Sequence, residues 1–92
     1  MNVPEEFKRA CGNLHQDIDL LAKTPDDLAL IAINSLTDYE KKIVKIFLEK
    51  TIRDVNSEVS LKNIWRAAGS DIFFPNPDDI LLVMRLMLKQ LN

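Results

Sequence analysis

The sequence predicts an all-α protein, a compact bundle of four to five helices in one domain covering residues 1–92. Apolar residues recur at spacings of three and four, which is the period of a helix with one buried face. Helix-start signals, in which proline or a capping residue is followed by acidic residues, recur along the chain. The chain is 47% apolar and 28% charged and has only two glycines, a composition typical of a folded globule.

The first helix is expected from Pro4 to about Lys23. Proline is well tolerated in a first helical turn, and the acids that follow it suit the positive end of the helix dipole. Gly12 is expected to weaken this helix without ending it. One apolar stripe follows the start signal, formed by Phe7, Cys11, Leu14, Ile18 and Leu21.

The second helix is expected over residues 25–34, with Thr24 as its capping hydroxyl and Pro25 at its first position. Asp26 and Asp27 place two acids in its first turn. The run from Leu28 to Ile33 is almost continuously apolar, so this helix is expected to be central and buried around most of its circumference.

The third helix is expected over residues 38–55, because Thr37 and Glu40 have the spacing of a capping box. The residues expected to face inward are Tyr39, Ile43, Ile46, Phe47 and the aliphatic stem of Lys50. The residues expected to face solvent are Lys41, Lys42, Lys45, Glu49 and Arg53.

Two further helices complete the predicted bundle. Ser60 is expected to cap a short fourth helix that Gly69 ends, with Leu61, Ile64, Trp65 and Ala68 in the core. Residues 70–76 are expected to be extended, because a residue before proline avoids helical angles. Asn76 and Pro77 then open the last helix, whose inward residues are Ile80, Val83, Met84, Met87, Leu88 and Leu91.

Composition also predicts a cytoplasmic protein. The single cysteine, Cys11, excludes an internal disulfide and fits a reducing compartment. The first residues lack the basic region and apolar run of a secretory signal, and no apolar stretch approaches the roughly 20 residues that span a bilayer. The net charge of −2 offers no overall attraction to nucleic acid or to an anionic membrane.

No catalytic, metal or cofactor site is predicted, so the protein is not expected to be an enzyme. Cys11, His15 and Asp19 would share one helix face, but side chains on successive turns point outward in parallel, whereas catalytic groups converge. Cys11 also belongs to the apolar stripe and is expected in the core. One cysteine and one histidine cannot supply a typical zinc site, and two glycines leave no phosphate-binding loop.

A small helix-turn-helix DNA-binding regulator is the alternative interpretation. Lys41, Lys42 and Lys45 form a local positive patch, and the fourth and fifth helices could form the motif. The second of these helices, however, opens with Asp78 and Asp79, which would repel the DNA backbone. The lysines are therefore expected to be an ordinary solvated face, and no direct contact with nucleic acid is expected.

The stretch over residues 71–79 is the predicted partner-binding segment. It carries two adjacent phenylalanines, two prolines and three aspartates, and it has no basic residue. Interfaces take much of their affinity from a few aromatic anchors, and acidic surfaces speed the capture of basic partners. Alternatively, one of the rings closes the core while the aspartates only favour the helix start. The predicted contact residues are Asp71, Phe73, Phe74, Asp78 and Asp79.

Residues 69–75, Gly-Ser-Asp-Ile-Phe-Phe-Pro, followed by acids and a closing helix, resemble the toxin-binding segment of DNase-colicin immunity proteins. In that family, an acidic-aromatic motif ends in two tyrosines and a proline. The chain here has phenylalanines in their place and one residue fewer between the acid and the aromatics. The resemblance implies that Asp71, Phe73 and Phe74 contact a toxin.

More broadly, the chain resembles the small α-helical immunity proteins of contact-dependent growth inhibition systems. The function that follows as an expectation is that of an immunity protein, which binds a cognate toxin and neutralises it by covering its active or substrate-binding surface. A basic, nuclease-type toxin domain is the expected partner, with no membrane and no small molecule involved.

Overall fold

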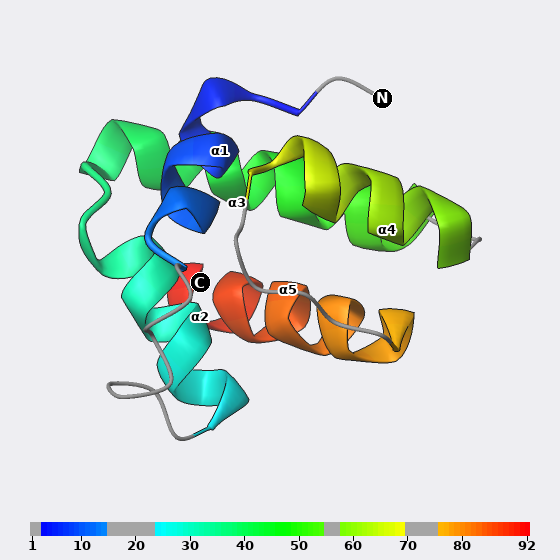
Figure 1. Cartoon of the computed structure of the whole chain (residues 1–92). Coiled ribbons are helices and arrows are strands. Elements are labelled where there is room, and N and C mark those ends of the chain that lie inside the picture. Colours follow the sequence, from blue (N-terminus) through cyan, green and yellow to red (C-terminus); the bar gives the residue numbers. More distant parts are fainter. Residues whose placement is uncertain (1–2, 15–23, 55–57, 70–75) are drawn as a thin grey trace.

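The computed structural model describes residues 3–14, 24–54, 58–69 and 76–92 (Figure 1). These ranges form an all-α bundle, and no strand occurs in them. The helices are α1 (Glu5–Gly12), α2 (Pro25–Asn34), α3 (Asp38–Asp54), α4 (Glu58–Ala67) and α5 (Pro77–Leu91). The predicted all-α class is therefore confirmed.

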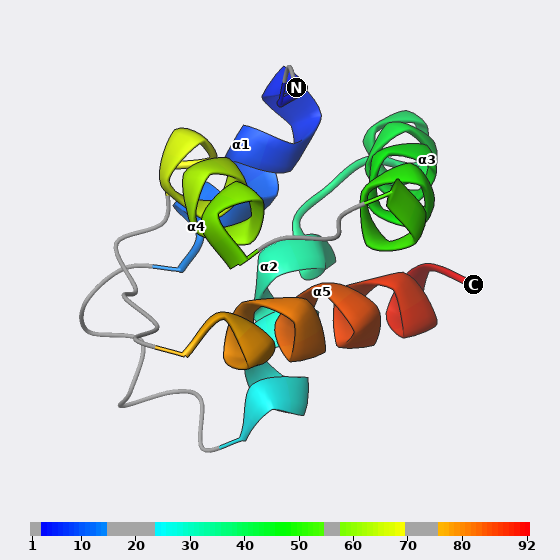
Figure 2. The same cartoon turned by 90° about the vertical axis from the view of Figure 1, so that its right-hand side faces the viewer.

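Helix α5 is the element around which the others pack. It contacts α2, α3 and α4, while α1 contacts α3 and α2. In Figure 2, α3 and α4 are seen nearly end-on, with α5 crossing below them and α1 above. The prediction that α2 is buried around most of its circumference is wrong: Leu30 is 48% exposed, and α2 fully buries only Ala29, Ala32 and Ile33.

The core lies between these helices. Its largest fully buried side chains include Phe7 from α1, Leu48 from α3 and Met84 from α5. Phe7 and Phe47 meet with ring centroids 4.9 Å apart at a tilt of 44°, a geometry that adds about 0.5–1.5 kcal/mol beyond area burial. The inward residues predicted for α4 are confirmed, because Leu61, Ile64, Trp65 and Ala68 are all buried.

Helix α1 is shorter than its apolar stripe predicts. It ends at Gly12, and the N–H groups of Asn13 and Leu14 donate to Ala10 and Cys11 in tight final-turn bonds. The Asn13 amide nitrogen then donates to the Ala32 carbonyl and to Ser35 Oγ at the end of α2. The prediction that the helix continues past Gly12 to Lys23 is therefore wrong, and a contact with α2 accompanies its end. Ile18 and Leu21 lie outside the described residues.

The inward face predicted for α3 is correct at Phe47 but wrong at three other positions. Its buried residues are Glu40, Val44, Phe47, Leu48 and Thr51. Tyr39 is 69% exposed and Ile46 is 65% exposed, and Lys50 is exposed as well, so three of the predicted inward residues face solvent. Glu40 lies on the buried side, where its carboxylate accepts a hydrogen bond from Arg9 of α1.

Helix α4 begins at Glu58, so Ser60 lies inside the helix and the prediction that it is the N-cap is wrong. The predicted end is confirmed. Gly69 has a φ of 80°, and its N–H donates to the Arg66 carbonyl, which is the left-handed conformation that glycine adopts after a helix.

The positive φ predicts opposite effects for the two glycines. Gly69→Ala should lower the free energy of unfolding by about 1 kcal/mol, because alanine is strained at positive φ. Gly12→Ala is the matched control, since no positive φ constrains it and no atom lies within 4 Å of an added Cβ; it should be neutral or slightly stabilising. Urea unfolding measures both. Equal effects of the two substitutions would contradict the assigned end of α4.

Candidate partner-binding site

The predicted contact residues fall into two groups. Asp71, Phe73 and Phe74 lie outside the described residues, so the structure neither joins them to nor separates them from the other two. Asp78 and Asp79 lie in the first turn of α5 and are both exposed. The described part of the candidate site is therefore the start of α5.

The first turn of α5 is well anchored. Asn76 is the N-cap, as predicted, and its side-chain oxygen accepts from the Asp78 N–H at 2.9 Å. The Asp79 N–H donates to the Asn76 carbonyl at 3.0 Å. Pro77 and Ile80 are buried on either side of the two aspartates. The backbone that carries the carboxylates is thus fixed, while the carboxylates themselves point to solvent.

The two carboxylates have no cationic partner in the described part of the chain. Ion pairs there join Lys8 to Glu5, Arg9 to Glu40 and Arg53 to Asp54, and neither Asp78 nor Asp79 belongs to them. The positive end of the helix dipole favours acidic residues at this position. Two adjacent negative charges are therefore held at the surface, where a cationic partner can reach them.

The same three residues, Pro-Asp-Asp, also begin α2. There Asp27 takes part in a capping box: its carboxylate accepts from the Thr24 N–H, and its own N–H donates to Thr24 Oγ1, both at 3.2 Å. In α5 the side chain of Asn76 caps the helix instead. Asp26 is exposed and occupies the same helix position as Asp78, so it provides a natural comparison for that residue.

The cysteine predicted in the core is there. Cys11 is fully buried, and burial raises the pKa of its thiol to about 12, which keeps the unreactive thiol form at neutral pH. His15 and Asp19 lie outside the described residues. Among the residues that are described, no cluster of three His, Cys, Asp or Glu side chains could hold a metal ion, and no buried side-chain nitrogen or oxygen lacks a hydrogen-bond partner.

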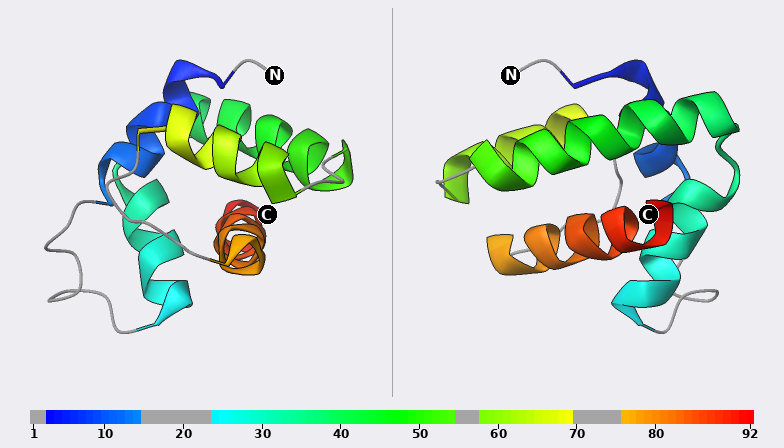
Figure 3. Two further views of the ribbon diagram at one scale, coloured as in Figure 1. Left: turned by 45° about the vertical axis from the view of Figure 1, so that its right-hand side comes forward. Right: turned by 180° about the vertical axis from the view of Figure 1, so that it is seen from behind.

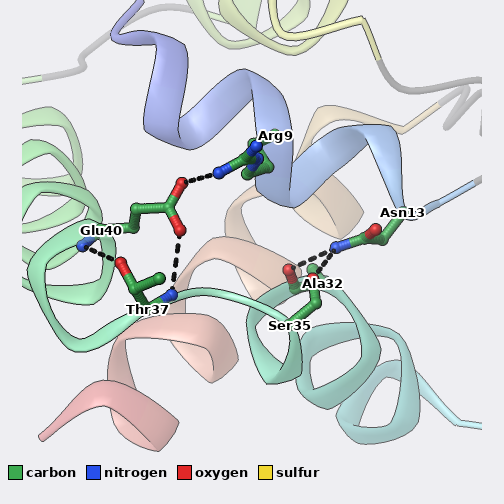
Figure 4. A network of polar contacts seen from close by, with 6 residues as sticks. All are labelled: Arg9, Asn13, Ala32, Ser35, Thr37 and Glu40. Atoms are coloured by element: carbon green, nitrogen blue, oxygen red, sulfur yellow. Dashed lines mark hydrogen bonds and ion pairs between the residues drawn. The ribbon is translucent and has the colours of Figure 1, made fainter.

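A polar network joins α1 to the start of α3 (Figure 4). Arg9 Nη1 donates to Glu40 Oε2 at 2.6 Å, and Glu40 Oε1 accepts from the Thr37 N–H at 2.9 Å. The Glu40 N–H donates in turn to Thr37 Oγ1 at 3.2 Å, so the predicted capping box is confirmed. The backbone bond from Thr37 and then the bond from Arg9 lower the pKa of Glu40.

Sequence reasoning found the local half of this network and missed the other half. Thr37 and Glu40 are three residues apart and form a known capping pattern. Arg9 is 31 positions from Glu40, and no local sequence pattern identifies it as the partner of Glu40. A hollow of about 500 Å³ lies beside the network, lined by Glu5, Glu6, Lys8, Arg9 and Glu40. Lys8 and Arg9 are paired with acids of the same hollow. We therefore interpret the hollow as part of the contact between α1 and α3 and not as a binding site.

No protein-family model matches the chain, and comparison with curated proteins and with solved structures gives no match either. No helix in the described ranges is long and apolar enough to cross a membrane.

The lowered pKa of Glu40 predicts how stability depends on pH. The pKa of a glutamate in an unfolded chain is about 4.3, and the pKa of Glu40 is lower in the folded state. Its stabilisation is therefore complete above the unfolded pKa and is lost as the pH falls through the folded pKa. In Glu40→Gln, which keeps an acceptor for the Thr37 N–H but loses the charge facing Arg9, the melting temperature should fall less between neutral and acid pH than in the wild type.

Glu49→Gln is the matched control, because it removes one charge from an exposed position of the same helix. It should preserve the wild-type acid dependence of the melting temperature. If Glu40→Gln melts with the same acid dependence as Glu49→Gln, the carboxylate of Glu40 does not couple pH to folding.

Proposed function

We propose that this chain is an immunity-type inhibitor, a small helical protein that binds a cognate toxin and covers its active or substrate-binding surface. The observation that carries the proposal is the start of α5. Asp78 and Asp79 are exposed there on an anchored turn, and they have no ion pair with any described residue. The sequence places Asp71, Phe73 and Phe74 directly before this turn.

Such a surface is suited to a basic partner. A nuclease binds a polyanion, so its substrate site is rich in lysine and arginine. Carboxylates on the inhibitor steer that site into place and raise the association rate, while aromatic side chains desolvated at the centre of the interface slow dissociation. Occupying the cationic site excludes the nucleic acid. The toxin is blocked without any covalent step.

Inhibition by occlusion requires no chemistry from the chain itself. The burial of Cys11 and the raised pKa of its thiol agree with this, since a nucleophilic cysteine needs access and thiolate character. We therefore propose a binding protein rather than an enzyme, with a basic nuclease-type toxin domain as its partner in the cytoplasm.

The DNA-binding alternative has less support. In a helix-turn-helix, about three or four residues join the two helices, whereas α4 ends at Ala67 and α5 begins only at Pro77. The first turn of α5, which would enter the major groove, presents the exposed Asp78 and Asp79. A gel shift with random duplex at low salt separates the two functions, because binding that weakens steeply with salt would favour the regulator.

Charge reversal tests the acidic contact. The triple substitution Asp71→Lys, Asp78→Lys, Asp79→Lys should slow association with a cognate toxin by at least about ten-fold at low salt, because it removes the steering charge. Stopped-flow mixing measures the rate. Asp78→Lys alone should slow association several-fold.

The matched control is Asp26→Lys, which changes the same charge at the same helix position in α2. Both single substitutions weaken the interaction with a helix dipole equally, so only a contact at α5 distinguishes them. If Asp26→Lys slows association as much as Asp78→Lys, the start of α5 is not the contact.

The aromatic pair affects the other rate constant. Phe73→Ala and Phe74→Ala should each increase the dissociation rate of the toxin complex about ten-fold or more while changing association little, as expected for a buried anchor. Surface plasmon resonance measures dissociation, and the melting temperature of the free protein separates binding from stability. A ring whose loss lowers the melting temperature but leaves dissociation unchanged belongs to the core.

A further inference from the structure

A second surface, opposite in charge to the first, lies on α3. Tyr39 and Ile46 are 69% and 65% exposed, and Lys42 lies between them at spacings of three and four, so the three share one helix face. Lys50, also exposed, follows Ile46 by one turn. We refer to Tyr39, Lys42, Ile46 and Lys50 as the outer α3 face. Seen from behind in Figure 3 (right), α3 lies in front and no other helix covers this side of it.

A hollow adjoins the outer α3 face. It has a volume of about 400 Å³ and is lined by Asp38, Lys41, Lys42, Lys45 and Leu91, which places it between the first turns of α3 and the end of α5. Lys42 belongs to both the hollow and the face. Three lysines against one aspartate make the hollow positive, and Leu91 gives it an apolar wall.

The lysines of the hollow are not neutralised by the described part of the protein. Lys41, Lys42 and Lys45 take part in none of the ion pairs that join its side chains. The net charge of the chain is −2, so the positive charge of this hollow is opposite in sign to that of the whole protein. It lies next to two exposed large apolar side chains. Scattered exposed apolar residues are ordinary, but apolar residues on one stripe bordered by charge are typical of an interaction site.

We propose that the outer α3 face and its hollow dock an acidic protein segment that carries apolar side chains between its carboxylates. The lysines of the hollow supply the charge complement, and Tyr39 and Ile46 supply the apolar contact, with tyrosine being a residue type common among interface hot spots. An amphipathic acidic helix fits this pattern, because its apolar side chains recur at the spacing of Tyr39 and Ile46 along α3. This surface is independent of the proposed toxin contact.

The apolar content favours a protein over a nucleic acid. Phosphate contacts use Lys41, Lys42 and Lys45 but leave Ile46 and the half-buried Leu91 without a partner, and a branched aliphatic side chain offers no flat ring for a base to stack on. A membrane is disfavoured by the rest of α3. A helix that lies in a bilayer interface buries its whole apolar face in lipid, whereas the main apolar face of α3, with Val44, Phe47 and Leu48, is in the core.

The test uses the full chain labelled with ¹⁵N and a synthetic helical peptide of glutamates and leucines at spacings of three and four. The peptide should shift the amide signals of the outer α3 face saturably. Lys42→Glu with Lys45→Glu should weaken its affinity at least about ten-fold, and Ile46→Ser should weaken it about ten-fold with little change in salt dependence. All three positions are at least partly exposed, and the melting temperature checks that the variants fold.

Lys62→Glu with Arg66→Glu on α4 is the matched control, because both side chains are exposed on another helix, and it should bind the peptide like the wild type. Four outcomes would overturn the proposal: no localised shifts, equal loss of affinity in the control, tighter binding of random duplex or phosphatidylglycerol vesicles than of the peptide, or concentration-dependent self-association that Ile46→Ser abolishes. Toxin binding separates this proposal from the proposed function. Charge reversal at α5 should abolish toxin binding and leave peptide binding intact, whereas Lys42→Glu with Lys45→Glu should weaken peptide binding and leave toxin binding intact.

Discussion

One carboxylate joins α1 to the start of α3. Glu40 is almost fully buried and makes three kinds of bond at once: it accepts from Arg9 of α1, it accepts from the Thr37 N–H, and its own N–H donates to Thr37. A buried charge is tolerated only when it is paired and hydrogen-bonded. Arg9 belongs to α1, so its bond lies on the side of α3 that faces α1, which is also the side of Val44, Phe47 and Leu48.

The side of α3 that carries Glu40 is also its core side. With Glu40 inside, the residues one or two turns further along the same side, Val44, Phe47 and Leu48, enter the core. Tyr39 and Ile46 are then carried outward, although they are as apolar as many core residues. Burial of the apolar side chains of α3 and the bond from Arg9 to Glu40 both favour the orientation in which Tyr39 and Ile46 face solvent.

The parts of the fold that sequence predicts are those fixed by neighbouring residues. Thr24, Thr37 and Asn76 cap the helices as expected, and Gly69 ends α4 because the required φ is positive. Two of the errors involve contacts between residues far apart in the sequence: Asn13 binds α2 where α1 ends, and Arg9 of α1 binds Glu40 on the buried side of α3. A third error concerns a local signal, because Ser60 lies inside α4 and does not cap it. Of the predicted contact residues, Asp78 and Asp79 were placed correctly at a helix start, since that signal is local as well.

The repeated Pro-Asp-Asp start shows how one local signal can serve two purposes. In α2 the second aspartate caps its own helix through Thr24, so its charge is used within the fold. In α5 the cap is Asn76, a neutral residue that satisfies the backbone and leaves both carboxylates unengaged. A neutral cap is sufficient for helix stability, since asparagine and aspartate are about equally good at that position. The two carboxylates of α5 are therefore not needed to cap the helix. They interact favourably with the helix dipole, and their exposure also leaves them accessible to a cationic partner.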